Sequence, residues 1–328
     1  MNLRIRDRLL LVTLLTAACA WCGCAPPTSD GDSNRKPRVA LIMKSLANEF
    51  FITMEKGARA HQQANADTYE LLANGIKDEL DVGRQIDLVE QMIAQKVDAI
   101  VIAPADSKAL VPVCRKAQQA GIVVVNIDNQ FDENVLADSP LRIPFVGPDN
   151  RHGARLVGEY LAKQLQPGDK VAIVEGAPNA FNGVQRKLGF EDAMKAGGMT
   201  IVSSQSGYWE TEKASQVVSA LVTEHPGLKA ILCANDSMAL GAVAALRDAN
   251  RLGAIQVVGY DNIAAARRLL QEGLILATAD QHADQLAVFG IEYALEMLKT
   301  QAAPADRETP VELITRETAS TDPQSRNP

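Results

Sequence analysis

Short, nearly continuous apolar runs alternate along this chain with longer segments in which apolar residues recur every three or four positions. Runs that are apolar at almost every position are typical of strands buried on both faces of a parallel sheet. Longer segments with one apolar face, such as 81–95 and 283–299, are typical of amphipathic helices that cover such a sheet. The predicted strands span residues 39–43, 69–73, 99–103, 122–127, 171–175, 200–204, 230–233, 256–260 and 275–279.

The repeated order of strand and helix predicts the fold class. Strands that are joined through helices form parallel sheets with helices on both faces. About ten such strands are more than one regular sheet usually holds, and 328 residues are enough for two domains. The sequence therefore predicts an α/β protein with two lobes, each built on a doubly wound parallel sheet. Ligands of such sheets bind outside the carboxyl ends of the strands.

Polar and aromatic side chains recur where the predicted strands end. Asp, Asn and Gln can satisfy both the donor and the acceptor side of hydroxyl groups, and an aromatic ring packs on the aliphatic face of a sugar ring. The pattern therefore favours a binding site for a small sugar or polyol. The side chains that follow the strands are Lys44, Asn48, Phe50, Phe51, Asp128, Asn129, Tyr208, Trp209, Asn235, Asp236, Asp261, Asn262 and Gln281.

Several of these residues also have a structural interpretation. Asp and Asn after a strand commonly cap the next helix, and we expect this of Asp236 and Asn262 more than of Asn235 and Asp261. One phenylalanine of the pair at 50–51 is expected to pack in the core. The recurrence of such groups at many strand ends supports a binding site more strongly than any single residue does.

The N-terminal segment predicts export and lipid attachment. Three arginines within residues 1–8 precede the apolar run 9–18, which is the layout of a secretory signal and is too short to span a bilayer. A cysteine after the run and a polar stretch beyond it look like a lipoprotein signal. We predict a signal over 1–24 with lipid on Cys24, Cys19 being the alternative, and then a flexible tether over 25–37. The protein is then periplasmic or at the cell surface, anchored to a membrane.

Composition and motifs argue against several classes of protein. The formal net charge is −7, whereas nucleic-acid binding needs clustered basic residues. The chain has no dinucleotide, phosphate-loop or nucleophile-elbow motif, and its four histidines lack metal-ligand spacing. We therefore expect no enzymatic activity, no cofactor and no metal. Beyond the signal, Cys114 and Cys233 lie in apolar patterns and are expected to be buried free thiols.

Four segments, 44–51, 126–129, 234–241 and 257–261, carry a resemblance to a known family. In this order they are similar to the signature segments of ribose-type periplasmic binding proteins, which are the solute-binding components of ABC importers. The segment 234–241 reads Ala-Asn-Asp-Ser-Met-Ala-Leu-Gly and is the most specific of the four. The likeness extends over nearly all of the chain from residue 38 to about 315.

The resemblance implies a type I periplasmic binding protein fold, whose lobes are joined by three crossovers and close on a sugar by hinge bending. One lobe would comprise 38–148 and 282–312, the other 149–281 and 313–318, with a tail at 319–328. It further implies a monomer that delivers a sugar or polyol to a membrane permease. The ligand contacts that we predict come from Lys44, Asn48, Phe50, Phe51, Asp128, Asn129, Asn182, Trp209, Asn235, Asp261 and Gln281.

Three positions depart from the ribose-type pattern. Lys44 stands where that family has a small hydroxyl residue, and Asn129 stands where it has an arginine. Val184 also replaces an arginine, although Asn182 and Arg186 are close by. The resemblance thus leaves the sugar open, and another pentose, a hexose or a sugar alcohol fits as well as D-ribose.

Two other functions use the same kind of fold. A sugar-sensing ectodomain would report its ligand to a membrane receptor through the same two lobes. A regulator of the lac-repressor type would need a helix-turn-helix headpiece of about 50–60 residues before the first strand, where this sequence has the predicted signal and tether. The sensor is therefore kept as the main alternative to the importer component, and the regulator is less favoured.

Overall fold

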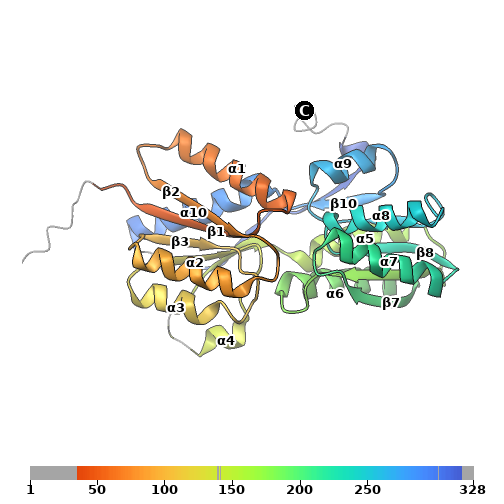
Figure 1. Ribbon diagram of the computed structural model, residues 1–328, viewed down its shortest axis with the longest axis horizontal. Coiled ribbons are helices and arrows are strands. Elements are labelled where there is room, and N and C mark those ends of the chain that lie inside the picture. Colours follow the sequence, from red (N-terminus) through yellow and green to blue (C-terminus); the bar gives the residue numbers. More distant parts are fainter. Residues whose placement is uncertain (1–34, 139, 141, 302, 320–328) are drawn as a thin grey trace, which may run out of the picture. The chain divides into compact units, whose positions relative to one another are not determined.

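The computed structural model describes residues 35–138, 140, 142–301 and 303–319 (Figure 1). The predicted signal, Cys19, Cys24 and the tail beyond residue 319 lie outside these residues, as does the predicted tether up to residue 34. Among the residues described, no helix is both long and apolar enough to cross a membrane.

Within the described residues, six strands form the first sheet, in the order β11-β5-β4-β3-β1-β2, and each neighbouring pair is parallel. Its inner strand β1 explains the continuous apolar run. Val39, Leu41 and Met43 enter one hydrophobic core, while Ala40 and Ile42 enter a second core, because successive side chains of a strand point to opposite faces. The strands are β1 (Arg38–Ser45), β2 (Glu70–Ile76), β3 (Ala99–Ile102), β4 (Val123–Ile127), β5 (Phe145–Pro148) and β11 (Arg307–Thr309).

Helices cover both faces of this sheet, with α1 on one side and α2 and α3 on the other (Figure 1). Leu88 and Cys114 of α2 and α3 belong to one core. Met54 of α1 and Leu286 of α10 belong to the other. The helices of this lobe are α1 (Glu49–Ala64), α2 (Val82–Ala94), α3 (Val111–Gln119), α4 (Glu133–Ala137) and α10 (Ala283–Thr300).

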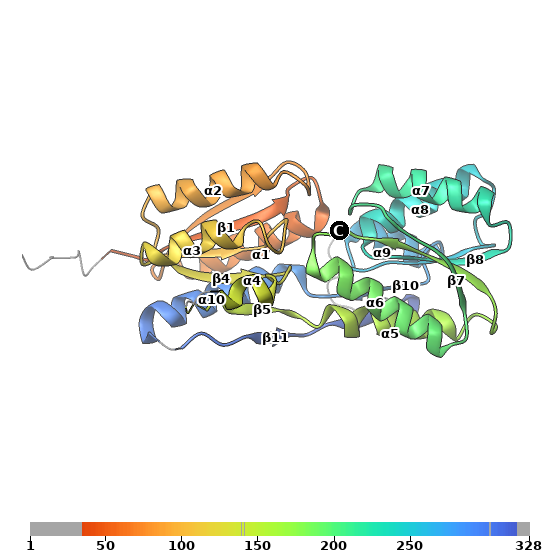
Figure 2. The same ribbon diagram turned by 90° about the horizontal axis from the view of Figure 1, so that it is seen from below.

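The second sheet has the order β12-β10-β9-β8-β6-β7 in the part of the chain that the structure describes. Its strands are parallel except for β12, which runs antiparallel to β10. Helices α7 and α8 lie on one side of it, and α5 and α6 lie on the other (Figure 2). The strands are β6 (Lys170–Glu175), β7 (Thr200–Ser206), β8 (Leu228–Cys233), β9 (Gln256–Val258), β10 (Ala277–Asp280) and β12 (Glu312–Thr315). The helices are α5 (Asn150–Ala162), α6 (Phe181–Ala196), α7 (Thr211–Glu224), α8 (Asp236–Asp248), α9 (Ala264–Gln271) and α11 (Arg316–Ala319).

Over the described ranges, the chain passes between the two sheets three times: from β5 to α5, from β10 to α10 and from β11 to β12. The third passage lies at residues 310–311. Glu312, which was expected in the first lobe, therefore pairs with Asp280 of the second sheet instead. The predicted α/β class, with two mainly parallel sheets and helices between the strands, is confirmed.

Several short elements escaped the sequence pattern. Strands β11 and β12 lie at the edges of their sheets and carry charged residues such as Arg307 and Glu312, which an edge strand tolerates and a buried strand does not. Strand β5 contains Gly147 and Pro148, which weaken any strand prediction. Strand β2 continues to Ile76, three residues beyond its predicted end.

Asp236 is a buried carboxyl group that holds parts of the second lobe together. Its Oδ1 accepts a hydrogen bond from the Thr278 hydroxyl at 2.8 Å, and its Oδ2 accepts one from the backbone N–H of Ile263 at 3.0 Å. Burial raises the pKa of Asp236 to about 6. The helix α8 is capped by Asn235 and not by Asp236, so the capping role expected of Asp236 is wrong.

We expect the contribution of Asp236 to the free energy of unfolding to decrease as the pH rises from about 4 to above 6. Its pKa in the folded chain is about 6, against about 3.9 for an unfolded chain. The folded state therefore binds more protons between these values and loses stability as they dissociate, by about 3 kcal/mol in full. Urea unfolding of the wild type and of Asp236→Asn at about pH 4.5, 6 and 7.5 measures this. Equal pH dependence in the two proteins would contradict it.

Candidate functional site

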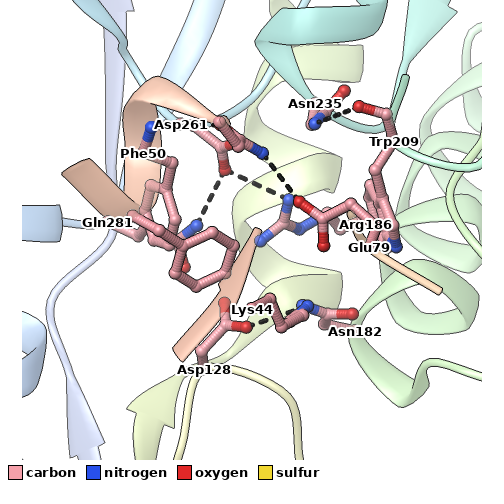
Figure 3. A pocket seen from close by; sticks show the side chains of 12 residues that line it. Lys44, Phe50, Glu79, Asp128, Asn182, Arg186, Trp209, Asn235, Asp261 and Gln281 are labelled. Carbon is pink, nitrogen blue, oxygen red and sulfur yellow. Dashed lines mark hydrogen bonds and ion pairs between the residues drawn. The ribbon is translucent and has the colours of Figure 1, made fainter. Parts of the chain in front are cut away.

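A cavity is lined by residues from both lobes (Figure 3). Most of these residues follow the carboxyl ends of strands, including β1, β4, β8 and β10, where ligands of doubly wound sheets bind. The structure places all of the predicted ligand contacts except Asn129 in this wall, and it adds Glu79 and Arg186. The lining residues are Lys44, Asn48, Phe50, Phe51, Glu79, Asp128, Asn182, Arg186, Trp209, Asn235, Asp261 and Gln281.

Three of the lining residues have unusual backbone conformations, which direct their side chains into the cavity wall. Asp128, Trp209 and Asp261 have φ angles of 61°, 70° and 116°, a region that non-glycine residues rarely adopt. Such conformations persist only where the surrounding structure enforces them, and they cluster at functional sites. Asp261, for example, is held by a hydrogen bond of 2.7 Å from its backbone N–H to the carbonyl oxygen of Ala279 in β10.

One side of the cavity holds a buried ion pair between Lys44 and Asp128. Lys44 Nζ lies 3.1 Å from Asp128 Oδ2, and the two side chains are 4% and 2% exposed. The same nitrogen lies 5.5 Å from the ring centre of Phe51 and 5.6 Å from that of Trp209, within the range of cation–π attraction. Carboxylate and aromatic groups therefore compensate for the burial of the ammonium group.

A second ionic group holds Arg186 in the cavity wall. Arg186 Nη1 donates to Asp261 Oδ1 at 3.2 Å, and Gln281 Nε2 donates to the same oxygen at 2.8 Å. The guanidinium group lies over the ring of Tyr260, 3.8 Å from its centre, and Nε donates to the side chain of Asn150 at 2.8 Å. Burial raises the pKa of Asp261 well above its usual range, and Arg186 opposes this effect.

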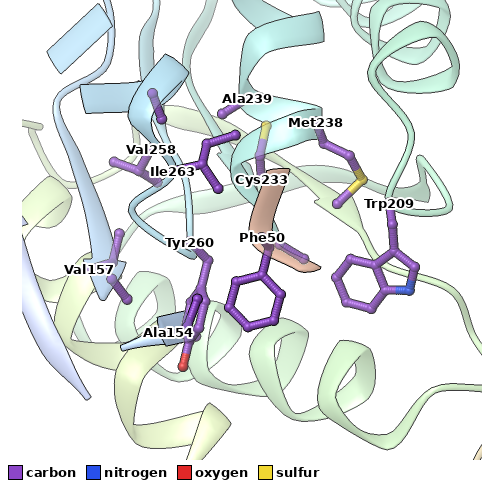
Figure 4. Packing of buried hydrophobic residues seen from close by; sticks show 14 of the residues in the cluster. Phe50, Ala154, Val157, Trp209, Cys233, Met238, Ala239, Val258, Tyr260 and Ile263 are labelled. Atoms are coloured by element: carbon purple, nitrogen blue, oxygen red, sulfur yellow. The ribbon is translucent and has the colours of Figure 1, made fainter. Parts of the chain in front are cut away.

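One phenylalanine of the pair 50–51 was expected to pack in the core. The structure buries both Phe50 and Phe51 there. Their rings meet edge to face, with centres 5.1 Å apart. Figure 4 shows Phe50 of the first lobe in the same cluster as Tyr260 and Trp209 of the second. The indole ring of Trp209 in turn lies against Gly176, where a Cβ atom would overlap it. The glycine after β6 is therefore what leaves room for this ring.

Glu79 is a lining residue that sequence reasoning missed. It is 5% exposed, its Oε1 accepts a hydrogen bond from Asn48 Nδ2 at 3.1 Å, and burial raises its pKa. Because β2 was predicted to end at residue 73, the loop after it was not recognised as a strand-end loop. Extending that strand to Ile76 would have placed Glu79 among the candidates.

Asn129 lies behind the cavity wall, so its predicted contact with the ligand is not supported. The preceding left-handed residue, Asp128, turns into the cavity, whereas the Asn129 side chain is fully buried. Its Oδ1 accepts from the backbone N–H of Asn182 at 3.1 Å, and its Nδ2 donates to the carbonyl oxygen of Pro104 at 2.8 Å. These bonds make it a support for the wall.

Position 184, where the ribose-type pattern has an arginine, does not line the cavity. Val184 is 41% exposed on α6, whereas Arg186, two residues later, points into the cavity. Asn182 and Arg186 are the polar residues that α6 contributes to the cavity wall.

Some hydrogen-bond acceptors in the wall have no partner among the described residues: Glu79 Oε2, Asn182 Oδ1 and Gln281 Oε1. Buried polar atoms are normally paired, so a ligand with several hydroxyl donors fits this wall. The charged residues are two cations, Lys44 and Arg186, and three carboxyl groups, Glu79, Asp128 and Asp261. Cations and carboxyl groups thus nearly offset one another in the wall, and this balance fits an uncharged ligand.

Over the described residues, no cluster of His, Cys, Asp and Glu side chains could hold a metal ion. Cys114 and Cys233 are buried and unpaired, as predicted.

Comparison with known proteins agrees with the fold. The family model described as a periplasmic binding protein domain matches residues 39–302. A D-ribose/D-allose-binding protein of Pseudomonas aeruginosa is 57% identical over 95% of this chain and 99% of its own length. A solved ABC transporter solute-binding protein of Burkholderia multivorans is 59% identical with a TM-score of 0.84, covering 86% of this chain and all of the other. Another, from Actinobacillus succinogenes with bound D-allose, is 35% identical with a TM-score of 0.82, over 88% and 100%.

These matches confirm the resemblance on which the sequence interpretation relied. They extend across both lobes and across most residues of the cavity wall. The chain therefore belongs to the periplasmic binding protein family.

Proposed function

We propose that this protein is the extracytoplasmic solute-binding component of an ABC-type sugar importer and that it holds one monosaccharide between its lobes. The observation that carries the proposal is a cavity walled by both lobes, with aromatic rings and unpaired acceptors on its surface. In this role the protein binds its ligand reversibly and does no chemistry on it.

The lining groups can be assigned to the parts of a sugar. Phe51 and Trp209 offer aromatic faces to the C–H groups of the ring. Lys44 and Arg186 donate hydrogen bonds to ring or hydroxyl oxygens, and the acceptors of Glu79, Asn182 and Gln281 bind hydroxyl protons. Because both lobes contribute, the closed form binds the sugar more tightly than an open form does, and the ligand shifts the protein toward closure.

We infer that the sugar is D-ribose or D-allose, two aldoses that share the relative configuration of their ring hydroxyl groups. The relative from Pseudomonas aeruginosa is described as binding both, and the solved relative from Actinobacillus succinogenes contains D-allose. The buried Lys44 and Glu79 favour a ligand with one polar group more than ribose, which D-allose has in its hydroxymethyl group.

The remaining parts of the proposal concern the membrane. The lipid anchor on Cys24, or on Cys19, would keep the protein near its permease. Labelled fatty acid should appear on the wild type and disappear in Cys24→Ala. Loss of label only in Cys19→Ala would move the attachment site, and no label on the wild type would contradict the anchor.

Titration calorimetry tests the sugar-binding function. We expect one D-ribose or D-allose to bind per protein, with weaker binding of D-glucose, D-galactose and myo-inositol. Absence of binding heat for every sugar would contradict the proposal. Binding of one sugar outside the ribose–allose pair would retain the importer role and overturn the inferred sugar. A sensor role, the alternative, predicts that deletion of the permease leaves the cellular response to the sugar intact.

A further inference from the structure

Two helices of the second lobe, α6 and α9, have an apolar N-cap residue, whereas α7, which also lacks a side-chain capping hydrogen bond, has Glu210 at this position. The N-cap residues of α6 and α9 are Ala180 and Ile263, neither of which makes a side-chain capping hydrogen bond. The first backbone N–H groups of a helix have no partner inside the helix. In the same lobe, α5 and α8 are capped by their own Asp149 and Asn235, so the two apolar caps are not a general property of this lobe.

The partner of α9 comes from the first lobe. Glu49, the first residue of α1, places its carboxylate at the start of α9: Oε1 accepts from the backbone N–H of Ala264 at 3.0 Å, and Oε2 accepts from that of Ala265 at 3.3 Å. A carboxylate at a helix N-terminus gains both the hydrogen bonds and the favourable helix dipole. Glu49 does not line the cavity, so it has no direct contact to offer a ligand there.

The partners of α6 come from the first lobe as well. Ser107 Oγ accepts from the backbone N–H of Phe181 at 2.9 Å, and Asn129 Oδ1 accepts from that of Asn182 at 3.1 Å. Beside them, Asp106 Oδ2 accepts from Asn179 Nδ2 at 2.8 Å. Both helices with an apolar N-cap residue are thus capped across the cleft, by side chains from different elements of the first lobe.

We propose that these caps form a latch that stabilises the closed form and that Glu49 thereby sets ligand affinity without touching the ligand. Separation of the lobes by hinge bending takes Glu49 and Ser107 away from α9 and α6, which have no polar N-cap residue to replace them. The caps therefore contribute only to the closed state. Because the apparent Kd equals the intrinsic Kd divided by the closed fraction, weakening the latch weakens binding.

The test rests on the proposed function and measures the binding and dissociation of D-allose and D-ribose in the full folded chain. We expect Glu49→Ala to raise Kd about fivefold, as the loss of a helix cap predicts, mainly through faster dissociation. Ser107→Ala should act in the same direction, and the two effects should multiply because the sites share no residue. Glu55→Ala is the matched control, since Glu55 lies on the same helix and pairs only with exposed Arg59.

An unchanged Kd and dissociation rate in Glu49→Ala would overturn the latch, as would an equal change in Glu55→Ala. If the wild type binds neither sugar, the proposed function fails and the latch is tested separately by small-angle X-ray scattering of the unliganded proteins. In that case, a larger radius of gyration for Glu49→Ala with Ser107→Ala than for the wild type supports the latch. Identical scattering curves would contradict it.

Discussion

Replacement of Asp261 by alanine is expected to weaken the binding of D-ribose or D-allose by about a hundredfold or more. The substitution removes a carboxylate from the cavity wall and leaves Arg186 buried without the oxygen at 3.2 Å that now accepts its hydrogen bond. Gln281 Nε2 loses its partner at the same atom. Removing one member of a buried charged pair costs about 2–5 kcal/mol in binding, and titration calorimetry measures it directly.

Two companion variants separate the causes of this loss. Asp261→Asn keeps an oxygen acceptor but not the charge, so we expect it to bind more tightly than Asp261→Ala and less tightly than the wild type. Asp248→Ala removes an exposed carboxylate at the end of α8 and should leave Kd unchanged. Wild-type affinity in Asp261→Ala would remove this residue from the site and call the position of the ligand into question.

The sequence predicted the two lobes and the place of the binding site better than the direction of single side chains, because continuous apolar runs have one physical cause. The strand β1 is apolar from Val39 to Met43 because it is buried on both faces there, and such strands have polar residues at or just beyond their carboxyl ends. This rule located Lys44, Asp128, Asn235 and Asp261 without any structure.

The same rule failed where local backbone geometry decides the direction of a side chain. Asp128 and Asn129 follow the same strand, yet only Asp128 lines the cavity, because its positive φ turns the next residue behind the wall. A similar failure occurred on α6, where about half a helical turn separates exposed Val184 from buried Arg186. Neither direction can be read from residue type alone.

The contacts between the lobes could not be predicted from the sequence. Glu49 and the start of α9 are about 215 positions apart in the chain, and no local pattern links them. The sequence does show that a cap is missing: the N-cap residues of α6 and α9 are Ala180 and Ile263, which have no polar side chain. A helix that lacks its own cap is a reason to look for one from elsewhere in the fold.

The second large effect is expected when the Lys44–Asp128 pair is broken, and it concerns the free energy of unfolding as well as the affinity for the sugar. Lys44→Met leaves Asp128 as a buried carboxylate without its cation, and we expect the free energy of unfolding to fall by about 3–5 kcal/mol. Urea unfolding of the unliganded protein measures this loss. The exposed pair of Lys116 and Glu90 supplies the control, since Lys116→Met should change stability by less than about 1 kcal/mol.

Replacing both partners then separates folding from binding. In Lys44→Met with Asp128→Asn, no charge is left buried and unpaired, and asparagine tolerates the positive φ of position 128, so stability should return to within about 1–2 kcal/mol of the wild type. Sugar binding should nevertheless be lost, because both charged groups have left the cavity wall. A buried ion pair is weak support for a stability role, and its retention in the wall of this cavity is best explained by recognition of a ligand. A stable double variant that still binds D-allose with wild-type affinity would contradict that explanation and leave the pair with a structural role only.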